Sequence, residues 1–181
     1  MKLTEIEIIE GCKKGLAAYQ KALFSRYSSL LLGVCQRYAR NTADAEDMLQ
    51  DAFIKIFSKI DQFKSAGSFE GWMRRIVVNT ALKKYSLTRY SKEISVENYV
   101  ENGMIAEAPA FAHLTEKDLL ALITRLPDGY RLIFNLYVVE GYSHDEIADI
   151  LGIQAGTSRS QLVKARGLLQ KQLFELHKLA V

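Results

Sequence analysis

One segment constrains the fold most tightly: residues 141–166, GYSHDEIADILGIQAGTSRSQLVKAR. Ser143 and Glu146 have the spacing of a capping box, in which each side chain hydrogen-bonds the backbone of the other residue at a helix N-terminus. Gly152 follows where a left-handed helix cap is needed. A basic helix comes directly afterwards. This order predicts a helix-turn-helix, whose second helix lies in the major groove of DNA. A helical hairpin with a solvated basic face is the alternative.

Helical periodicity also dominates the rest of the chain. Apolar residues recur every three or four positions in stretches that predict helices at 16–39, 43–60, 69–89, 115–125, 127–140, 144–151 and 155–178. No stretch alternates convincingly like a strand, and eleven glycines and two prolines leave few interruptions. We therefore predict an all-α fold of two small helical domains joined by a flexible linker. The predicted bounds are 1–92 for the first domain, 93–115 for the linker and 116–181 for the second domain.

Charge divides the chain into blocks. Residues 62–92 carry seven Lys and Arg against one Glu, whereas residues 93–116 carry five Glu and no Lys or Arg. The basic block also contains aromatic residues and a polar loop. A basic groove with platforms for unstacked bases is how proteins bind single-stranded nucleic acid. The composition therefore predicts nucleic-acid contact for the basic block, with a merely solvated face as the alternative.

An acidic face is predicted on the helix at 43–60. Asp44, Asp47 and Asp51 recur at i, i+3 and i+7, and Gln50 borders them. Such a face is either solvated or turned toward a partner. A metal-dependent enzyme that uses these carboxylates is a rival hypothesis, but no histidine lies near them in the sequence. No Cys, His or carboxylate set has metal-ligand spacing. We therefore expect no metal, no cofactor and no catalytic centre.

Three stretches resemble the sigma-70-type transcription initiation factors of the small extracytoplasmic-function (ECF) class. Residues 44–57, DAEDMLQDAFIKIF, resemble the helix that binds core RNA polymerase. Residues 63–85 resemble the regions that melt and hold the minus-ten element, and residues 126–166 resemble region 4, which recognises the minus-thirty-five element. The resemblance implies two helical domains that bind core polymerase, direct it to promoters, help to melt the DNA and catalyse nothing themselves.

The resemblance also implies roles for individual residues. The beta-prime clamp helices of core polymerase would contact Asp44, Asp47, Gln50 and Asp51. Promoter DNA at the minus-ten element, duplex and then melted single strand, would contact Lys64, Ser65, Ser68, Arg74, Arg75, Asn79, Lys83 and Lys84. The minus-thirty-five element would contact Thr157, Arg159, Ser160, Lys164 and Arg166.

Further partners follow from the same class. Region 4 would also contact the beta flap of the polymerase. Membership of the class would also make an anti-sigma factor a plausible regulatory partner. The recognition helix departs from the family pattern, which usually has an apolar residue at position 158 and often an arginine at position 161. Here Ser158 and Gln161 stand instead, and Gln154 replaces a better helix cap. The base contacts of this helix are therefore left unassigned.

The first rival hypothesis is a stand-alone helix-turn-helix regulator that binds duplex DNA as a dimer. The acidic helix and the separate basic block argue against it. The N-terminal residues are acidic where a signal peptide needs an apolar core, and no apolar run is long enough to span a bilayer, so we expect a cytoplasmic protein without membrane insertion. Cys12 and Cys35 are expected to be reduced thiols, and His144 and His177 to be solvated surface residues.

Overall fold

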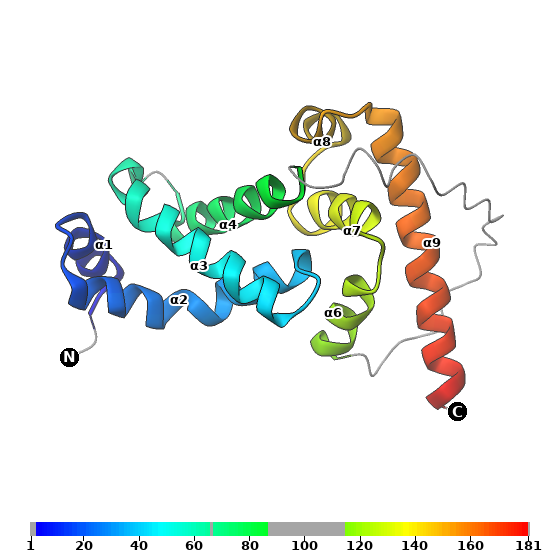
Figure 1. Ribbon diagram of the computed structural model, residues 1–181, viewed down its shortest axis with the longest axis horizontal. Coiled ribbons are helices and arrows are strands. Elements are labelled where there is room, and N and C mark those ends of the chain that lie inside the picture. The colour runs from blue at the N-terminus through cyan, green and yellow to red at the C-terminus, as the bar shows by residue number, and fades with distance from the viewer. Residues whose placement is uncertain (1–2, 66, 87–114, 181) are drawn as a thin grey trace. The chain divides into compact units, whose positions relative to one another are not determined.

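The computed structural model describes residues 3–65, 67–86 and 115–180, and within these ranges the regular structure is helical, with no strand (Figure 1). The chain divides into two compact units, Met1–Lys84 and Tyr85–Val181. These findings confirm the predicted all-α fold with two helical domains. The predicted linker, residues 93–115, lies outside the described residues except for Thr115.

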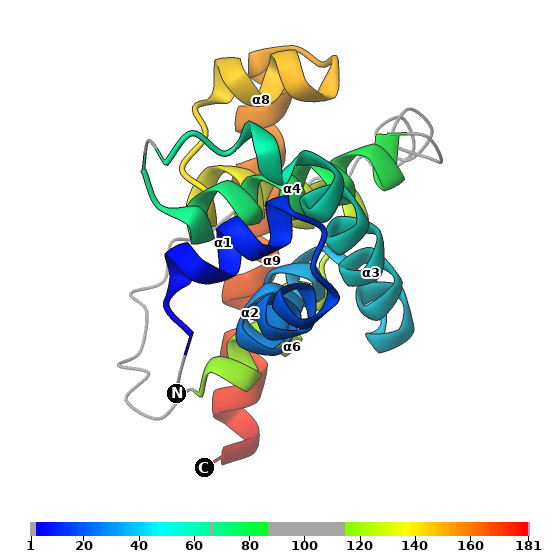
Figure 2. The same cartoon turned by 90° about the vertical axis from the view of Figure 1, so that its left-hand side faces the viewer.

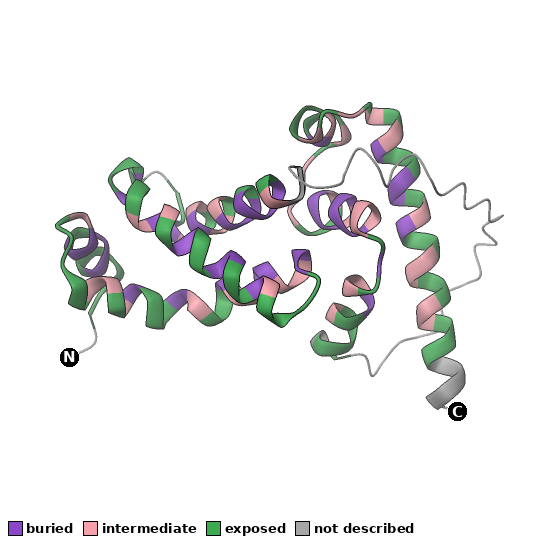
Figure 3. Ribbon diagram, in the orientation of Figure 1, coloured by how far each residue is buried: buried purple, intermediate pink, exposed green. Residues whose placement is uncertain are grey.

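Unit 1 contains five helical elements. They are α1 (Glu5–Lys13), α2 (Ala17–Tyr38), α3 (Thr42–Lys59), the 3-10 turn η1 (Ile60–Gln62) and α4 (Phe69–Ser86), which ends at the unit boundary. α1 and α3 both pack against α2, as Figure 2 shows from the end of the unit. The buried residues of α2 and α3 recur at helical spacing along the faces that meet (Figure 3). Apolar periodicity therefore predicted these two helices well.

The helix α1 was not predicted. It begins with a capping box: the Thr4 hydroxyl accepts a hydrogen bond from the Glu7 amide, and the Glu7 carboxylate accepts one from the Thr4 amide at 2.8 Å. The helix buries Ile8, Ile9 and Cys12. The Thr-x-x-Glu pattern is the same signal that Ser143 and Glu146 give, so it could have located this helix as well.

In the described part of unit 2, three shorter helices pack against a long one. Its elements are α6 (Glu116–Thr124), α7 (Asp128–Phe134), the π-helical turn η2 (Asn135–Val139), α8 (His144–Leu151) and α9 (Ala155–Ala180). α6, α7 and α8 each contact α9. The core contains Leu122, Leu132, Ile133, Leu136, Ile147, Leu162 and Ala165. The predicted helix at 127–140 is thus α7 continued by η2.

A buried arginine joins two elements of this unit. Arg131 is 3% exposed, and its guanidinium donates to the Asp128 carboxylate at 2.5 Å and to the Thr124 carbonyl at 2.9 Å. The Thr124 carbonyl is at the end of α6, where backbone acceptors lack partners within the helix. Arg131 therefore neutralises the Asp128 carboxylate at the start of α7 and also caps the C-terminal end of α6.

The predicted helix-turn-helix is present. Ser143 and Glu146 form the capping box at the start of α8, and Gly152 caps its end with φ 66° and ψ 37°. A left-handed residue at this position suits glycine, which has no Cβ to clash. Ile147 is fully buried, whereas Ile150 on the same short helix is 41% exposed. α8 contacts both α9 and η2.

Candidate nucleic-acid and protein interfaces

The acidic face of α3 is only partly as predicted. Asp47, Gln50 and Asp51 are exposed, and the apolar Ile54 extends the same face with 66% exposure. Asp44 differs, because its side chain is 19% exposed and its carboxylate lies 2.5 Å from the Lys84 ammonium. The exposed part of the acidic face therefore consists of Asp47, Gln50 and Asp51, with an apolar residue beside them that sequence analysis did not select.

Asp44 is held in place by neighbours on both sides. Its backbone amide donates to the Asn41 side chain, which caps α3, and its carboxylate accepts from the Arg40 amide at 3.1 Å. Burial alone would raise the pKa of Asp44, but the Lys84 and Arg40 hydrogen bonds outweigh it and lower that pKa. Asp44 is therefore ionised in the folded protein and is committed to contacts within unit 1.

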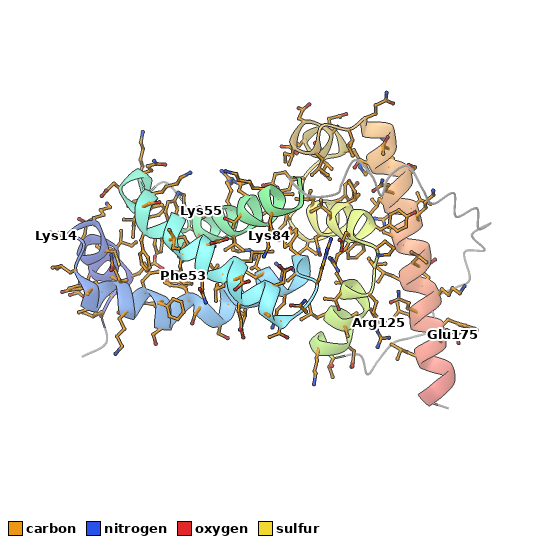
Figure 4. The ribbon with its side chains drawn as sticks, viewed as in Figure 1. Lys14, Phe53, Lys55, Lys84, Arg125 and Glu175 are labelled. Atoms are coloured by element: carbon orange, nitrogen blue, oxygen red, sulfur yellow. The ribbon has the colours of Figure 1, made fainter. Side chains whose placement is uncertain are left out.

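The ion pair joins the two helices that sequence analysis assigned to different partners. Figure 4 labels Lys84 on α4 and Lys55 on α3. Lys55 donates to the Thr80 hydroxyl at 3.0 Å, and that hydroxyl donates to the Ile76 carbonyl. The Phe53 side chain projects from another side of α3 (Figure 4), where the centroid of its ring lies 4.7 Å from that of Phe24. Lys55 and Lys84 thus connect α3 to α4.

The basic residues predicted to contact minus-ten DNA do not form a single surface. Arg75, Asn79 and Lys83 are exposed and follow one another at i, i+4 and i+8, so they form a stripe along α4. We call these three residues the α4 stripe. Arg74 is half-buried, and Lys84 lies against Asp44. Within α4, the α4 stripe is therefore the exposed part of the predicted set.

The loop before α4 presents the other predicted residues. Lys64 and Ser65 are exposed, and Ser65 has a left-handed backbone with φ 55°. Ser68 caps α4, since its hydroxyl accepts from the Gly71 amide at 3.2 Å. Behind the loop, the Phe63, Phe69 and Trp72 rings lie 4.9 to 5.6 Å apart. Trp72 is half-buried in this cluster and Phe69 is 2% exposed, so these rings support the loop.

The recognition helix α9 separates its residues into an outer and an inner face. Arg159, Ser160 and Arg166 are exposed, while Thr157 and Lys164 are half-buried. Val163 is 69% exposed on the same outer side and was missed by sequence analysis. Two of the three residues that depart from the family pattern are on the inner face, because Ser158 is 0% and Gln161 6% exposed, whereas Gln154 is exposed before the helix begins. The departures at Ser158 and Gln161 therefore concern packing rather than direct contact with bases.

His144 is not the solvated residue that we expected. Its ring stacks on Tyr137 with centroids 4.3 Å apart, and its Nδ1 lies 2.9 Å from the Ser158 hydroxyl. Burial lowers the pKa of His144, and the positive charges of Arg159 and Arg166 lower it further, against an opposing effect of Asp145. The expectation failed because it considered the residue without its tertiary neighbours. The side chain of His177 lies outside the described residues.

Among the described residues, no group of three or more His, Cys, Asp and Glu side chains is arranged to hold a metal ion. None of the described helices combines the length and the hydropathy that crossing a membrane requires. Cys12 and Cys35 are free thiols, both buried, and burial raises the pKa of each.

Comparison with known proteins assigns the two units. Residues 23–89 match the family model of sigma-70 region 2, and residues 116–169 match that of sigma-70 region 4. The chain belongs to the sigma-70 family. Within it, the chain is 29% identical to the ECF RNA polymerase sigma-E factor of Escherichia coli K12, covering 97% of both chains. The sigma-E factor of Haemophilus influenzae is 27% identical, covering 97% of this chain and 98% of that one.

A solved structure supports the same assignment. The chain is similar to the sigma factor RpoE of Bartonella quintana, crystallised with the anti-sigma factor NepR, with a TM-score of 0.50 and 25% identity. The match covers 86% of this chain and 96% of RpoE. Both sigma regions and the full-length similarity place the protein in the ECF class that the sequence resembled.

Proposed function

We propose that the two units of this ECF sigma factor divide the work of promoter recognition, with unit 1 binding core polymerase and the minus-ten element and unit 2 binding the minus-thirty-five element. The protein directs core RNA polymerase to specific promoters and starts transcription there. The observation that supports this division is that unit 1 exposes side chains of opposite charge on two different helices. Exposed acids lie on α3, and exposed basic and amide groups lie on α4.

The exposed part of α3 is the proposed contact with core polymerase. Asp47 and Asp51 offer carboxylates to the basic residues of the beta-prime clamp helices, and Gln50 offers an amide between them. Ile54 adds an exposed apolar side chain, which gains stability when a partner covers it. Asp44 contributes indirectly, because its ion pair with Lys84 fixes α3 to α4. Unit 2 would add a second contact, with the beta flap.

The α4 stripe and the loop before it are the proposed contact with the minus-ten element. Lysine and arginine bind the phosphates of both duplex and melted DNA, and this attraction carries no sequence information. Asn79 can donate to and accept from the edge of an unstacked base. The half-buried Arg74, the cap Ser68 and the loop residues Lys64 and Ser65 complete the proposed set.

The outer face of α9 is the proposed contact with the minus-thirty-five element. Arg159 and Ser160 are near the helix N-terminus, the part of a recognition helix that meets base edges. Arginine pairs with guanine through two hydrogen bonds, and Lys164 and Arg166 suit phosphates. Thr157 is half-buried, and its carbonyl accepts from the Ser160 hydroxyl at 3.0 Å.

Several further assignments complete this proposal. The domain bounds remain 1–92, 93–115 and 116–181, with the linker joining two separate DNA contacts. The factor acts in the cytoplasm, carries no catalytic centre, and leaves polymerization to the core enzyme. An anti-sigma factor is a proposed regulatory partner, in line with the RpoE relative crystallised with NepR.

Run-off transcription with purified core polymerase tests the proposal. A library of promoters with randomised upstream and minus-ten segments is transcribed with and without the protein, and the transcribed templates are sequenced. We expect transcripts only with the protein, enriched for two short elements. Tight binding to duplex DNA without core, together with no stimulation of transcription, would instead favour the stand-alone regulator.

A further inference from the structure

The contact between α8 and α9 contains polar groups where apolar packing is the rule. Ser158 is fully buried on the inner face of α9, the face on which Leu162 and Ala165 are also buried. A buried hydroxyl without a hydrogen-bond partner destabilises the folded state, because it has lost its bonds to water. One turn later, the Gln161 side-chain oxygen is buried, and no described residue donates to it. A hydrogen-bond partner for Ser158 is therefore important for seating α9 at this contact.

His144 supplies that partner. Its Nδ1 lies 2.9 Å from the Ser158 hydroxyl, and its ring lies flat on Tyr137 at 4.3 Å with 20° between the planes. Tyr137 belongs to η2, His144 to α8 and Ser158 to α9, so one imidazole ring connects three elements of unit 2. Since a stacked ring cannot turn freely, the hydrogen bond has a fixed direction.

The charges around His144 favour the neutral ring. Burial, Arg159 and Arg166 all lower the pKa of His144, whereas Asp145 on its own helix raises it. A neutral imidazole carries one donor and one acceptor nitrogen. The serine hydroxyl can donate or accept, so it completes a hydrogen bond with Nδ1 in either tautomer. The bond to Ser158 thus needs no charged partner.

We propose that His144 is a positioning residue for promoter recognition, which sets the rotation of α9 about its axis by holding Ser158 inward. Thr157 and Arg159 flank Ser158 in the sequence, and Ser160 follows two positions after it. Fixing the direction of Ser158 fixes the outward direction of these neighbours, because successive residues of a helix are rotated by about 100°. This inference rests on the proposed function of α9.

The test compares the promoter preferences of five proteins, the parent and four variants, each in complex with core polymerase. His144→Phe keeps a ring that can stack on Tyr137 but leaves the Ser158 hydroxyl without its partner. Ser158→Ala removes the hydroxyl, and the double variant replaces the polar pair with an apolar one. Each holoenzyme transcribes the randomised promoter library, and enrichment is measured separately at the upstream and the minus-ten elements. Asp149→Ala, an exposed change on α8, is the matched control.

We expect His144→Phe to reduce discrimination at the minus-thirty-five element by about three- to tenfold, as an unpaired buried hydroxyl displaces α9. The double variant should recover most of this loss, and Asp149→Ala should resemble the parent. Minus-ten discrimination should stay unchanged in every variant. Melting temperatures measured in parallel identify a purely structural role, which would lower stability while leaving both preferences intact.

The outcomes separate this inference from the function on which it rests. If the parent protein gives no core-dependent transcription, the proposed function fails. If the parent enriches both elements but His144→Phe keeps the parental minus-thirty-five preference, the positioning role is wrong. If the double variant is no better than His144→Phe, the hydrogen bond is not the cause, and the inference is equally contradicted.

Discussion

The helices α4 and α9 both carry basic side chains that are proposed to contact DNA, but they hold them in different ways. On α4 one of the predicted DNA-binding residues, Lys84, lies 2.5 Å from Asp44 of α3, the helix proposed to bind polymerase. On α9 the outer residues are separate from the inner Ser158, whose hydroxyl lies 2.9 Å from the His144 ring of α8. In the proposed function, unit 1 therefore uses charges both to hold its helices together and to bind partners. Unit 2 keeps these two tasks on opposite faces of one helix.

The largest expected effect is on the stability of unit 2 alone. Arg131→Ala removes a buried guanidinium and leaves Asp128 and the Thr124 carbonyl without it, which should cost about 3–5 kcal/mol of unfolding free energy. Hydrogen exchange followed by mass spectrometry should show faster exchange in α6 to α9 and unchanged exchange in α2 and α3. Arg125→Ala, an exposed arginine at the same connection (Figure 4), should have little effect. Equal loss of protection in both units would mean that they do not fold separately.

Charge reversal on α3 should have the next largest effect. Asp47→Arg places a positive charge opposite the basic clamp helices, and we expect core affinity to fall by about tenfold or more. Asp61→Arg reverses another exposed acid of unit 1 and serves as the control. Affinity is measured by titrating labelled protein with core polymerase, and circular dichroism checks the fold. Equal affinity of Asp47→Arg and the parent would remove this surface from the proposed interface.

A smaller effect is expected from the recognition helix. Arg159→Ala should cost about 1–3 kcal/mol if the side chain binds a base, and the loss should fall on one upstream position. Arg75→Ala on α4 is its counterpart, and it should weaken minus-ten binding without changing upstream preference. Both are measured as enrichment in library transcription. A uniform loss over all upstream sequences would show that Arg159 binds phosphate only.

The smallest effect concerns the ion pair within unit 1. Asp44→Asn and Lys84→Met, alone and together, should give a coupling energy of about 1 kcal/mol or less, because the pair is partly exposed. The pKa of Asp44 is lowered on folding, so its stabilisation is full above the ordinary value of 3.8 and is lost as the pH falls below it. Denaturant unfolding of unit 1 over this range should show a shallower acid dependence in Asp44→Asn. An unchanged dependence would mean that the pair adds no stability.

Local signals in the sequence predicted much of the fold. Periodicity located α2, α3 and α4, and the capping box with Gly152 located α8 and the turn after it. These features depend on neighbours within a few positions of the chain. The helix α1 was missed although Thr4 and Glu7 give the same local signal as Ser143 and Glu146.

Contacts between distant residues could not be predicted in this way. The pairing of Asp44 with Lys84 joins residues forty positions apart, so spacing alone assigned them to different partners. The pair of His144 and Ser158 needs the turn between α8 and α9 to be in place before either residue has its neighbour. The roles of the exposed residues, such as Asp47 and Arg159, came from the family resemblance and remain predictions.

Footprinting of the holoenzyme on one promoter from the library tests the central claim most directly. Hydroxyl radicals map the upstream contact, and permanganate marks unpaired thymines at the minus-ten element. We predict that Arg159→Ala weakens upstream protection more than it weakens melting on that promoter. Arg75→Ala combined with Asn79→Ala should reduce melting while upstream protection persists. Loss of both signals together in either variant would contradict the division of promoter recognition between the two units.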